Sequence, residues 1–533
     1  MNRLIKRLFA IGGLCCMPMG IYAYDITVDG IYYNILSEEE KTLSVTNKDE
    51  WITDYVGDIE IPSSVEYNGQ SWSVVAIEAD TFKDHAILNS IVLPEGIRTI
   101  PDYAFRNCNE MHTVVLPNSI DSIGNRVFLA CSRLESINIP EHVSFIGSYL
   151  FEDCIELRVI VLPEGITTIP EGLFFYCEGL DSVNIPSTVT TIGDFAFMDC
   201  LQLKSVVFPE NLQTIGDNVF DESGLTSADV PNSVTSIGAF AFAHCQDLTF
   251  IHLPENLNVL SQAILSGCPS LTSLTIPKTL EIIGESALGG CTSIMSLDIP
   301  ETVCSIGNGA FGSTGISTLI LPSGITDIGE YTFGNCPNLV SMVIPNGVEH
   351  IGEGAFAGCF SLESVTLPNS IKYMDSWVFQ ECSSLKEIIF PDLLDEISPW
   401  MCIQCTNLKK VVIPEHVEFI KSYAFCDCTS LTDFYCLAKA PPLIAVSFGD
   451  TPIEQATLHV QKESYYSYKS TDPWSRFGNI KVIEEGELGI GTLHNDDLPP
   501  IYYDLNGHPS VSPHKGINIL QKANGKTIKT LNN

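Results

Sequence analysis

The sequence predicts an α/β solenoid, in which coils of about 23 residues stack and each contributes one short parallel strand. Three observations lead to this fold class. Proline recurs fifteen times from Pro94 to Pro414, at 23-residue intervals in twelve cases and 22-residue intervals in two. Columns of isoleucine and phenylalanine follow each proline at a nearly constant distance. Finally, 45% of the 533 residues are hydrophobic, and units this short can bury their apolar faces only against one another.

The charge of the chain excludes some classes of partner. The formal net charge is -38, from 65 acidic and 27 basic side chains. Such a surface repels nucleic acid phosphates and anionic lipid, and no stripe of Lys and Arg counteracts this. We therefore expect no nucleic-acid partner. The simplest role of the acidic surface is to keep a long apolar solenoid soluble.

Residues 1–23 are predicted to be a signal peptide for export. Three basic side chains in the first seven residues precede an apolar run of about a dozen residues, and Ala23 suits a cleavage point. The run is too short to span a bilayer comfortably, so we expect no transmembrane segment after signal removal. Cys15 and Cys16 leave a lipoprotein open as an alternative, although Leu14 is not the small residue expected before a lipid-modified cysteine.

Residues 24–71 are predicted to form an N-terminal β cap. Apolar and polar residues alternate there, and Asp29-Gly30 and Asn68-Gly69 are typical of two-residue hairpin turns. A solenoid needs such a cap because its first coil otherwise exposes an unpaired edge.

Residues 72–436 contain about sixteen coils, and one coil can be followed in residues 131–154. Ser136-Ile137-Asn138-Ile139 alternates polar and apolar residues and predicts a strand with one face buried. Pro140 lacks an N–H group and ends that strand. The Ile-Gly dipeptide then turns the chain, and the A-F-x-x-C segment is expected to return it through a compact turn or a short helix.

The repeat P-x-x-[IV]-x-x-I-G-x-x-A-F-x-x-C-x-x-L-x-x-[IV]-x-[IL] resembles the BspA-like leucine-rich repeat family, also called the Treponema pallidum type. The resemblance covers roughly residues 72–436. It implies a leucine-rich-repeat right-handed superhelix with β-rich end caps. It also implies an exported surface protein of the Bacteroidetes type that acts as an adhesin or protein-binding scaffold rather than as an enzyme.

Thirteen cysteines occupy one column of the repeat, three residues after the phenylalanine column. We interpret them as small buried side chains at the bend into the strand. In the two 22-residue units this position holds Ser223 and Thr314, a replacement that a metal site or a set of disulfides would not tolerate. The column consists of Cys108, Cys131, Cys154, Cys177, Cys200, Cys245, Cys268, Cys291, Cys336, Cys359, Cys382, Cys405 and Cys428.

Other roles for the cysteines remain open. Isolated disulfides near the end of the array fit an exported protein, and the oxidation state of Cys436 stays undetermined. Cys402, Cys405, Cys426 and Cys428 imitate a zinc-binding arrangement. However, the repeat accounts for all of these four except Cys426, so we expect no metal and no cofactor. Cys304 falls in a column of polar residues and is expected to be an exposed thiol, with a reactive or intermolecular role as the alternative.

Candidate binding residues lie on the outward face of the strands. Four residues before each proline the side chain is almost always Ser or Thr, and two residues before it the side chain varies. A solvated strand face with hydrogen bonds between coils explains the constant column. The departures in the middle of the array are the predicted partner-binding residues, namely Asp229, Phe250, His252 and Asp298. No catalytic residues are predicted, because the histidines are scattered and no nucleophile, base and carboxylate share a recognisable spacing.

The end of the chain departs from the repeat. Residues 437–484 are predicted to form a C-terminal cap with a strand, a Tyr-bearing helix and two aromatic residues, Trp474 and Phe477, over the last coil. Residues 485–500 are acidic and contain glycine, as expected for a linker. Residues 501–533 are predicted to form a small β module, and they resemble C-terminal modules that serve as sorting signals in some exported proteins of Bacteroidetes.

These observations predict a secreted or cell-surface, non-catalytic scaffold for binding or adhesion. Its partner would be an extracellular protein or a glycan, of host or microbial origin. The alternative is a structural component of the envelope or of a biofilm matrix, without a specific ligand.

Overall fold

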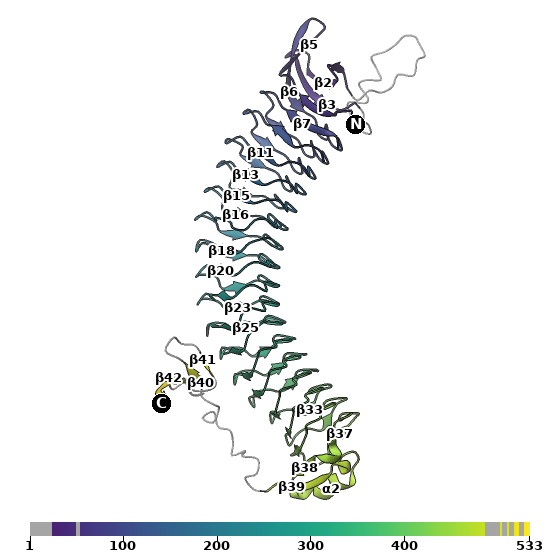
Figure 1. The fold of residues 1–533 in the computed structure, drawn as a ribbon, viewed down its shortest axis with the longest axis vertical. Helices are drawn as coiled ribbons and strands as arrows, with labels where there is room; N and C mark the ends of the chain where they lie inside the picture. The colour runs from purple at the N-terminus through teal and green to yellow at the C-terminus, as the bar shows by residue number, and fades with distance from the viewer. Residues whose placement is uncertain are drawn as a thin grey trace, which may run out of the picture.

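The computed structural model describes residues 24–48 and 54–484, together with short strands within 501–532. Coils are stacked into a long, bowed array, with a β-sheet over the first coils and the helical segments at the other end (Figure 1). The predicted signal peptide, residues 1–23, and the predicted linker, residues 485–500, lie outside the described residues. The solenoid predicted from the repeat is confirmed.

The predicted strand lies directly before the proline of nearly every coil, and successive strands pair in parallel with a constant register. In the pairing of β11 with β13, for example, each residue lies opposite the residue 23 positions later. The first strand column consists of β4 (Gly57–Glu60), β7 (Leu88–Val92), β9 (Thr113–Val115), β11 (Ser136–Asn138), β13 (Val159–Val161), β15 (Ser182–Asn184), β18 (Ser227–Asp229), β20 (Phe250–His252), β22 (Ser273–Leu274), β24 (Ser296–Leu297), β26 (Thr318–Leu319), β28 (Ser341–Val343), β30 (Ser364–Thr366), β32 (Glu387–Ile389), β34 (Lys410–Ile413), β36 (Asp433–Cys436), β38 (Thr457–Val460) and β39 (Asn479–Val482).

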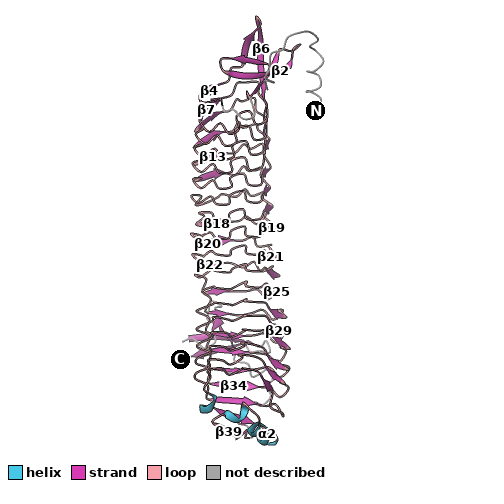
Figure 2. Ribbon diagram, turned by 90° about the vertical axis from the view of Figure 1, so that its right-hand side faces the viewer, coloured by secondary structure: helices cyan, strands magenta, loops and turns pink. Residues whose placement is uncertain are grey.

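The sequence predicted one strand per coil, but most coils contain a second strand of two residues. This strand ends at the isoleucine of the Ile-Gly turn. Its isoleucine is buried and the residue before it faces outward. The strand pairs with the corresponding strand of the next coil. Figure 2 shows the two columns along opposite edges of the array. The second column consists of β8 (Thr99–Ile100), β10 (Ser122–Ile123), β12 (Phe145–Ile146), β14 (Thr168–Ile169), β16 (Thr191–Ile192), β17 (Thr214–Ile215), β19 (Ser236–Ile237), β21 (Val259–Leu260), β23 (Ile282–Ile283), β25 (Ser305–Ile306), β27 (Asp327–Ile328), β29 (His350–Ile351), β31 (Tyr373–Met374), β33 (Glu396–Ile397), β35 (Phe419–Ile420) and β37 (Leu443–Ile444).

The A-F-x-x-C segments form turns rather than short helices. Two residues around each segment have a positive φ, as Arg126 (52°) and Ala130 (58°) show in one coil. A left-handed residue cannot continue a right-handed helix, so the chain turns at these two corners instead. Of the two conformations expected for this segment, the turn is therefore the one observed.

The core runs the length of the array as a ladder of phenylalanine rings. From Phe82 to Phe242 each ring stacks on the ring of the next coil, with centroids 5.1–5.7 Å apart. Leu265 and Leu288 interrupt the ladder, and it resumes at Phe311. The isoleucine, leucine and cysteine columns are buried around it, so that each coil completes the core of its neighbours.

Before the first coils lies a five-stranded sheet in the order β1 (Ile26–Val28), β2 (Ile31–Ser37), β3 (Thr42–Thr46), β6 (Gln70–Ile77) and β5 (Ser64–Tyr67). Two of its three hairpins, β1–β2 and β5–β6, turn at the predicted Asp-Gly and Asn-Gly pairs, where all four residues have a positive φ. Tyr55 is tied to this sheet, because its hydroxyl accepts from the N–H of Tyr32 at 3.1 Å and donates to the carbonyl oxygen of Thr46 at 2.7 Å. Its ring packs on Phe82, with centroids 4.8 Å apart, and so covers the open end of the phenylalanine ladder. This contact supports the proposed capping role of the sheet.

At the other end, β38 and β39 extend the first strand column beyond the point where the sequence period stops. The intervening segments contain η1 (Ile453–Gln455), η2 (Lys462–Ser464), α2 (Tyr465–Ser470) and η3 (Trp474–Arg476). Trp474 is fully buried, contacts Phe434 with ring centroids 5.9 Å apart and donates its indole N–H to the carbonyl oxygen of Pro442 at 3.1 Å. This packing supports the proposed C-terminal cap.

Four antiparallel strands follow in residues 501–532: β40 (Ile501–Tyr503), β41 (Pro509–Ser510), β42 (Gly516–Gln521) and β43 (Thr527–Asn532). The sorting role suggested for this module stays a prediction. In the part of the chain that the structure describes, no helix has both the length and the apolar character that crossing a membrane requires.

Candidate binding surface

The structure brings three of the four predicted binding residues together on the first strand column. In the pairing of β18 with β20, Asp229 lies opposite His252, and Ser227 lies opposite Phe250. Neighbouring parallel strands are about 4.8 Å apart, so these side chains are adjacent on the outward face. Asp298 follows β24 in the same column but three coils after Asp229. It therefore lies roughly 14 Å along the array and is not part of the same cluster.

The outward face of this column is open and partly apolar. Phe250 is 42% exposed, and farther towards the N-terminus Val161 is 63% and Val207 83% exposed. Parallel sheets are ordinarily covered on both faces, whereas here one face carries large apolar side chains in contact with solvent. An exposed apolar surface next to charged residues is typical of an interaction site.

Val207 marks a break in this face that the sequence did not indicate. No strand forms at residues 205–207, so one sheet ends at β15 and the next begins at β18. Just before the break, the side-chain amide of Asn184 bonds both backbone groups of Leu162, accepting from its N–H at 2.8 Å and donating to its carbonyl oxygen at 3.4 Å. The open face therefore consists of separate short sheets.

Hydrogen bonds between coils were expected from the Ser and Thr column four residues before each proline. The structure shows such bonds one position earlier. Thr249 donates to the carbonyl oxygen of Thr226 at 3.0 Å, and Thr272 donates to that of Thr249 at 3.3 Å. These hydroxyls tie successive coils together, while the next column remains turned to solvent.

The cysteine ladder has a structural explanation in the hydrogen bonds of its thiols. Each of the thirteen Sγ–H groups donates to a backbone carbonyl oxygen of the phenylalanine column in the preceding coil, over 3.0–3.3 Å. All thirteen are buried free thiols. All members of the column donate to the equivalent backbone carbonyl oxygen. This agrees with the structural role inferred from the sequence.

The two hydroxyl replacements occupy the same buried corner. Thr314 donates to the carbonyl oxygen of Phe311 at 2.7 Å and lies 3.3 Å from the sulfur of Cys336. Ser223 lies 3.4 Å from the sulfur of Cys245. In both shortened coils the hydroxyl therefore lies beside the ladder thiol of the next coil, and Thr314 bonds within its own coil rather than to the preceding one.

The four cysteines that imitate a zinc site are separated by the fold. Cys402 lies in the core, and the thiols of Cys405 and Cys428 bond to carbonyl oxygens of the ladder. The thiol of Cys426 lies over Gly449, where a Cβ atom would collide with it. This contact supplies the structural reason that the sequence lacked. Among the described residues, no group of three or more His, Cys, Asp or Glu side chains is placed to hold a metal ion.

We expect one thiol to react far faster than the others in the folded protein. Cys304 is exposed and Cys426 is partly exposed, whereas the remaining cysteines of residues 24–484 are buried. Burial also raises the pKa of ladder thiols, to about 12 for Cys291, and so removes the reactive thiolate. Labelling with a thiol reagent at pH 8, followed by peptide mass spectrometry, should show rapid modification of Cys304. Replacing Cys304 by Ser should remove the fast phase, and rapid labelling of several ladder cysteines would contradict the packing.

A cluster of titratable residues lies at the edge of the array opposite the first strand column. The sequence patterns did not indicate this cluster. Asp221 is buried and its carboxylate lies 2.8 Å from Nδ1 of His244. Burial raises the pKa of Asp221, and the bond to His244 acts in the opposite direction. Asp199 lies one coil earlier, and burial together with Glu222 raises its pKa to about 6. These residues fall in columns of the repeat that vary freely, so no period in the sequence singled them out.

A surface hollow of about 330 Å³ adjoins this cluster. Its walls include Glu222, His244 and the Ser223-Gly224 pair of the first 22-residue coil. Gly224 approaches the preceding coil so closely that a Cβ atom would collide with the carbonyl oxygen of Leu201. The hollow therefore lies at the corner that the shortened coil tightens.

Comparison with known proteins agrees with the fold. A family model described as the BspA-type leucine-rich repeat region matches the chain repeatedly between residues 75 and 432. Comparison with curated proteins gave no significant match.

Several solved structures are similar to the chain. A leucine-rich repeat protein from Bacteroides ovatus is 25% identical, with 77% of this chain and 94% of that chain covered and a TM-score of 0.42. A leucine-rich cell surface protein from Faecalibacterium prausnitzii is 26% identical, with coverages of 68% and 93% and a TM-score of 0.44. A leucine-rich repeat protein of T. pallidum is 20% identical, with coverages of 54% and 88% and a TM-score of 0.17.

Proposed function

The chain belongs to the BspA-type leucine-rich repeat family, and from this premise we propose that it is a non-catalytic scaffold for binding or adhesion. In this proposal the protein is exported, acts at the cell surface or outside the cell, and engages a host or microbial protein or a glycan. The basic and apolar N-terminal residues support export, because they have the composition of a signal peptide.

One observation carries the proposal: the first strand column leaves a parallel sheet uncovered on its outward face. The exposed ring of Phe250 stands beside the adjacent pair Asp229 and His252 on that face. In a complex, such an apolar side chain is buried against the partner while the polar groups beside it form directional hydrogen bonds. Aromatic residues dominate the energetics of many interfaces. The array repeats this open face over many coils, which suits a large partner.

The test is a binding screen of the mature chain, residues 24–533, against extracellular proteins and glycans, combined with surface labelling of intact cells. We expect a saturable partner and labelling at the cell surface. Absence of any saturable binding would contradict a binding role and favour a structural component of the envelope or matrix. Turnover of a peptide or glycan by the purified chain would contradict a non-catalytic role.

The array itself suggests variants that keep the fold. Replacing Phe250 by Ser restores the side chain common in its column, and replacing Asp229 and His252 by Asn introduces a residue that the same column holds at Asn138. We expect the combined variant to bind the partner at least tenfold more weakly. The matched control is Phe145→Thr, which removes a ring that is even more exposed, 55% against 42% for Phe250, from the second strand column and should change binding less than twofold. Unchanged binding of the combined variant would exclude this part of the face.

A further inference from the structure

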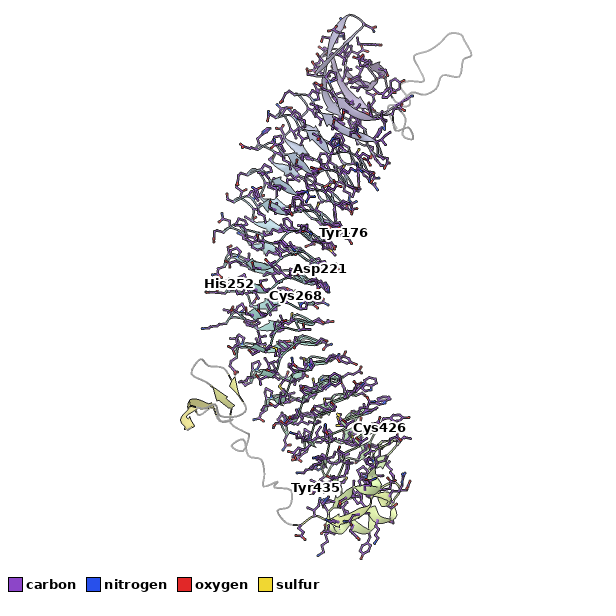
Figure 3. The ribbon with its side chains drawn as sticks, in the orientation of Figure 1. Tyr176, Asp221, His252, Cys268, Cys426 and Tyr435 are labelled. Carbon is purple, nitrogen blue, oxygen red and sulfur yellow. The ribbon has the colours of Figure 1, made fainter. Side chains whose placement is uncertain are left out.

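The residue before the ladder cysteine forms a distinct column on the edge opposite His252. This position has a positive φ throughout the array. In five consecutive coils it holds Asp153, Tyr176, Asp199, Glu222 and His244. Figure 3 shows Tyr176 and Asp221 together on this edge and His252 on the other. The column therefore belongs to a different surface from the strand face described above.

Aromatic rings gather beside this column. Phe175 lies at the centre, with its ring centroid 4.3 Å from that of Tyr176, 6.1 Å from Tyr149 and 6.1 Å from Phe195. Tyr176 is 39% exposed, so its ring is open to solvent. Electron-rich faces of this kind attract cations.

Carboxyl groups without a basic partner complete the surface. Asp199 is only 9% exposed, and the residue that follows it in the same column, one coil later, is another carboxylic acid, Glu222. The nearby charges that act on Asp199 are those of Glu222, Asp221 and Glu178, and they raise its pKa together with burial. The backbone N–H of Tyr176 donates to the carbonyl oxygen of Met198 at 3.0 Å, so Tyr176 and Asp199 lie in adjacent coils, and Asp199 is the main cause that raises the pKa of Tyr176. Asp199 therefore lacks a countercharge.

The chain fills a similar arrangement with one of its own cations. Three coils before Asp199, the guanidinium of Arg126 lies 4.7 Å from the ring centroid of Tyr149, and its Nε is 3.5 Å from a carboxylate oxygen of Glu152. Tyr103, in the coil before, also raises the pKa of Arg126. An aromatic ring and a carboxylate at the other corner of the same turns thus hold a guanidinium. Around Tyr176, rings and carboxyl groups also gather, but without one.

We propose that the corner surface formed by Tyr176, Phe175, Asp199 and Glu222 binds an arginine side chain of a protein partner. A guanidinium stacks on aromatic rings and bonds to carboxylates in a fixed planar geometry, and Arg126 shows the same combination within the chain. The residues around this surface favour a cation: residues 153–244 contain thirteen acidic and two basic side chains. One of these two, Lys204, already bonds to Asp247 at 3.2 Å. The inference rests on the proposed binding role only in taking the partner to be a protein.

The test measures binding of a fluorescent peptide of alternating arginine and glycine to the full chain, by fluorescence anisotropy. A peptide with citrulline in place of arginine keeps the shape and removes the charge, so it should bind at least tenfold more weakly. Free arginine and spermidine, added as competitors, distinguish a site for peptide arginine from one for small free cations. Displacement by micromolar spermidine but not by unlabelled peptide would overturn the proposal.

Variants locate the site. Tyr176→Asn removes the ring and keeps a residue that tolerates a positive φ, and we expect threefold to fivefold weaker binding. Tyr176→Phe keeps the ring and should bind within twofold of the unmodified chain. The pair Asp199→Asn and Glu222→Gln should weaken binding tenfold or more.

The matched control is Glu210→Gln, which removes one negative charge from an exposed position directly after Pro209. We expect a change of less than twofold. An equal loss for Glu210→Gln and for Asp199→Asn would mean attraction by net charge alone and would overturn the proposal, as would unchanged binding of Tyr176→Asn. Binding by the strand face is tested separately with the variants of Asp229, Phe250 and His252, so failure of this inference is distinguishable from failure of the proposed function.

Discussion

Replacing Gly147 by Ala is expected to lower the free energy of unfolding by about 3 kcal/mol. A Cβ atom at this position would lie 2.5 Å from the backbone nitrogen of Asn125 and 2.5 Å from the carbonyl oxygen of Gly124 in the preceding coil. Real Cβ atoms do not approach backbone atoms so closely, and a backbone cannot rotate away as a side chain can. The φ of Gly147 is not positive, so the cost comes from collision alone rather than from conformational strain.

The close approach is fixed by hydrogen bonds that tie each coil to the next. The backbone N–H of Asn125 donates to Oδ1 of Asp102 at 2.7 Å, and the N–H of Ser148 donates to Oδ1 of Asn125 at 2.9 Å. Separating two coils to admit a methyl group would lengthen these bonds. The glycine is therefore required by the spacing of neighbouring coils.

Gly324→Ala is the matched control for this prediction. The nearest atom to a Cβ there is the carbonyl oxygen of Val303 at 3.6 Å, an ordinary contact, and its φ is not positive either. Alanine should be neutral or slightly stabilising, because it reduces the freedom of the unfolded chain. Denaturant unfolding, with hydrogen exchange to localise the effect, compares the two variants. Equal stabilities would contradict the close packing at Gly147.

The sequence predicted those features in which the contacting residues are one period apart along the chain. Residues 23 positions apart are adjacent in the array, so the proline, phenylalanine and cysteine columns predicted the strand, the ring ladder and the buried thiols. The adjacency of Asp229 and His252 follows from the same rule, as does the separation of Asp298 from them. In a repeat protein the period itself carries the tertiary contacts.

Features that do not follow from the period alone were not predictable in this way. The reason for the glycine column lies in distances between backbone atoms of adjacent coils, and a glycine in a sequence equally suits a turn. Cys426 packs over Gly449 beyond the last regular coil. Tyr176, Asp199 and Glu222 are 23 residues apart, so the period places them side by side, but the residue types in their column vary and nothing in the sequence marked this column as a surface.

Replacing Phe151 by Ala is expected to destabilise the array by about 3–5 kcal/mol. Phe151 is fully buried, and its ring stacks on Phe128 and Phe174 at centroid distances of 5.6 Å and 5.7 Å. The substitution therefore removes two ring contacts and leaves a cavity between coils. Those coils cannot move together to fill it, because hydrogen bonds between neighbouring coils fix their spacing.

The matched control is Phe151→Leu, because Leu265 and Leu288 already occupy the same column and are fully buried. We expect leucine to cost less than about 1.5 kcal/mol. Each coil contacts only its neighbours, so alanine should increase hydrogen exchange mainly in residues 117–186 and leave the caps protected. A loss of protection that extended to Phe425 would mean that the whole array unfolds as one unit. Equal effects of alanine and leucine would instead mean that the ring ladder contributes little to stability, which its close stacking argues against.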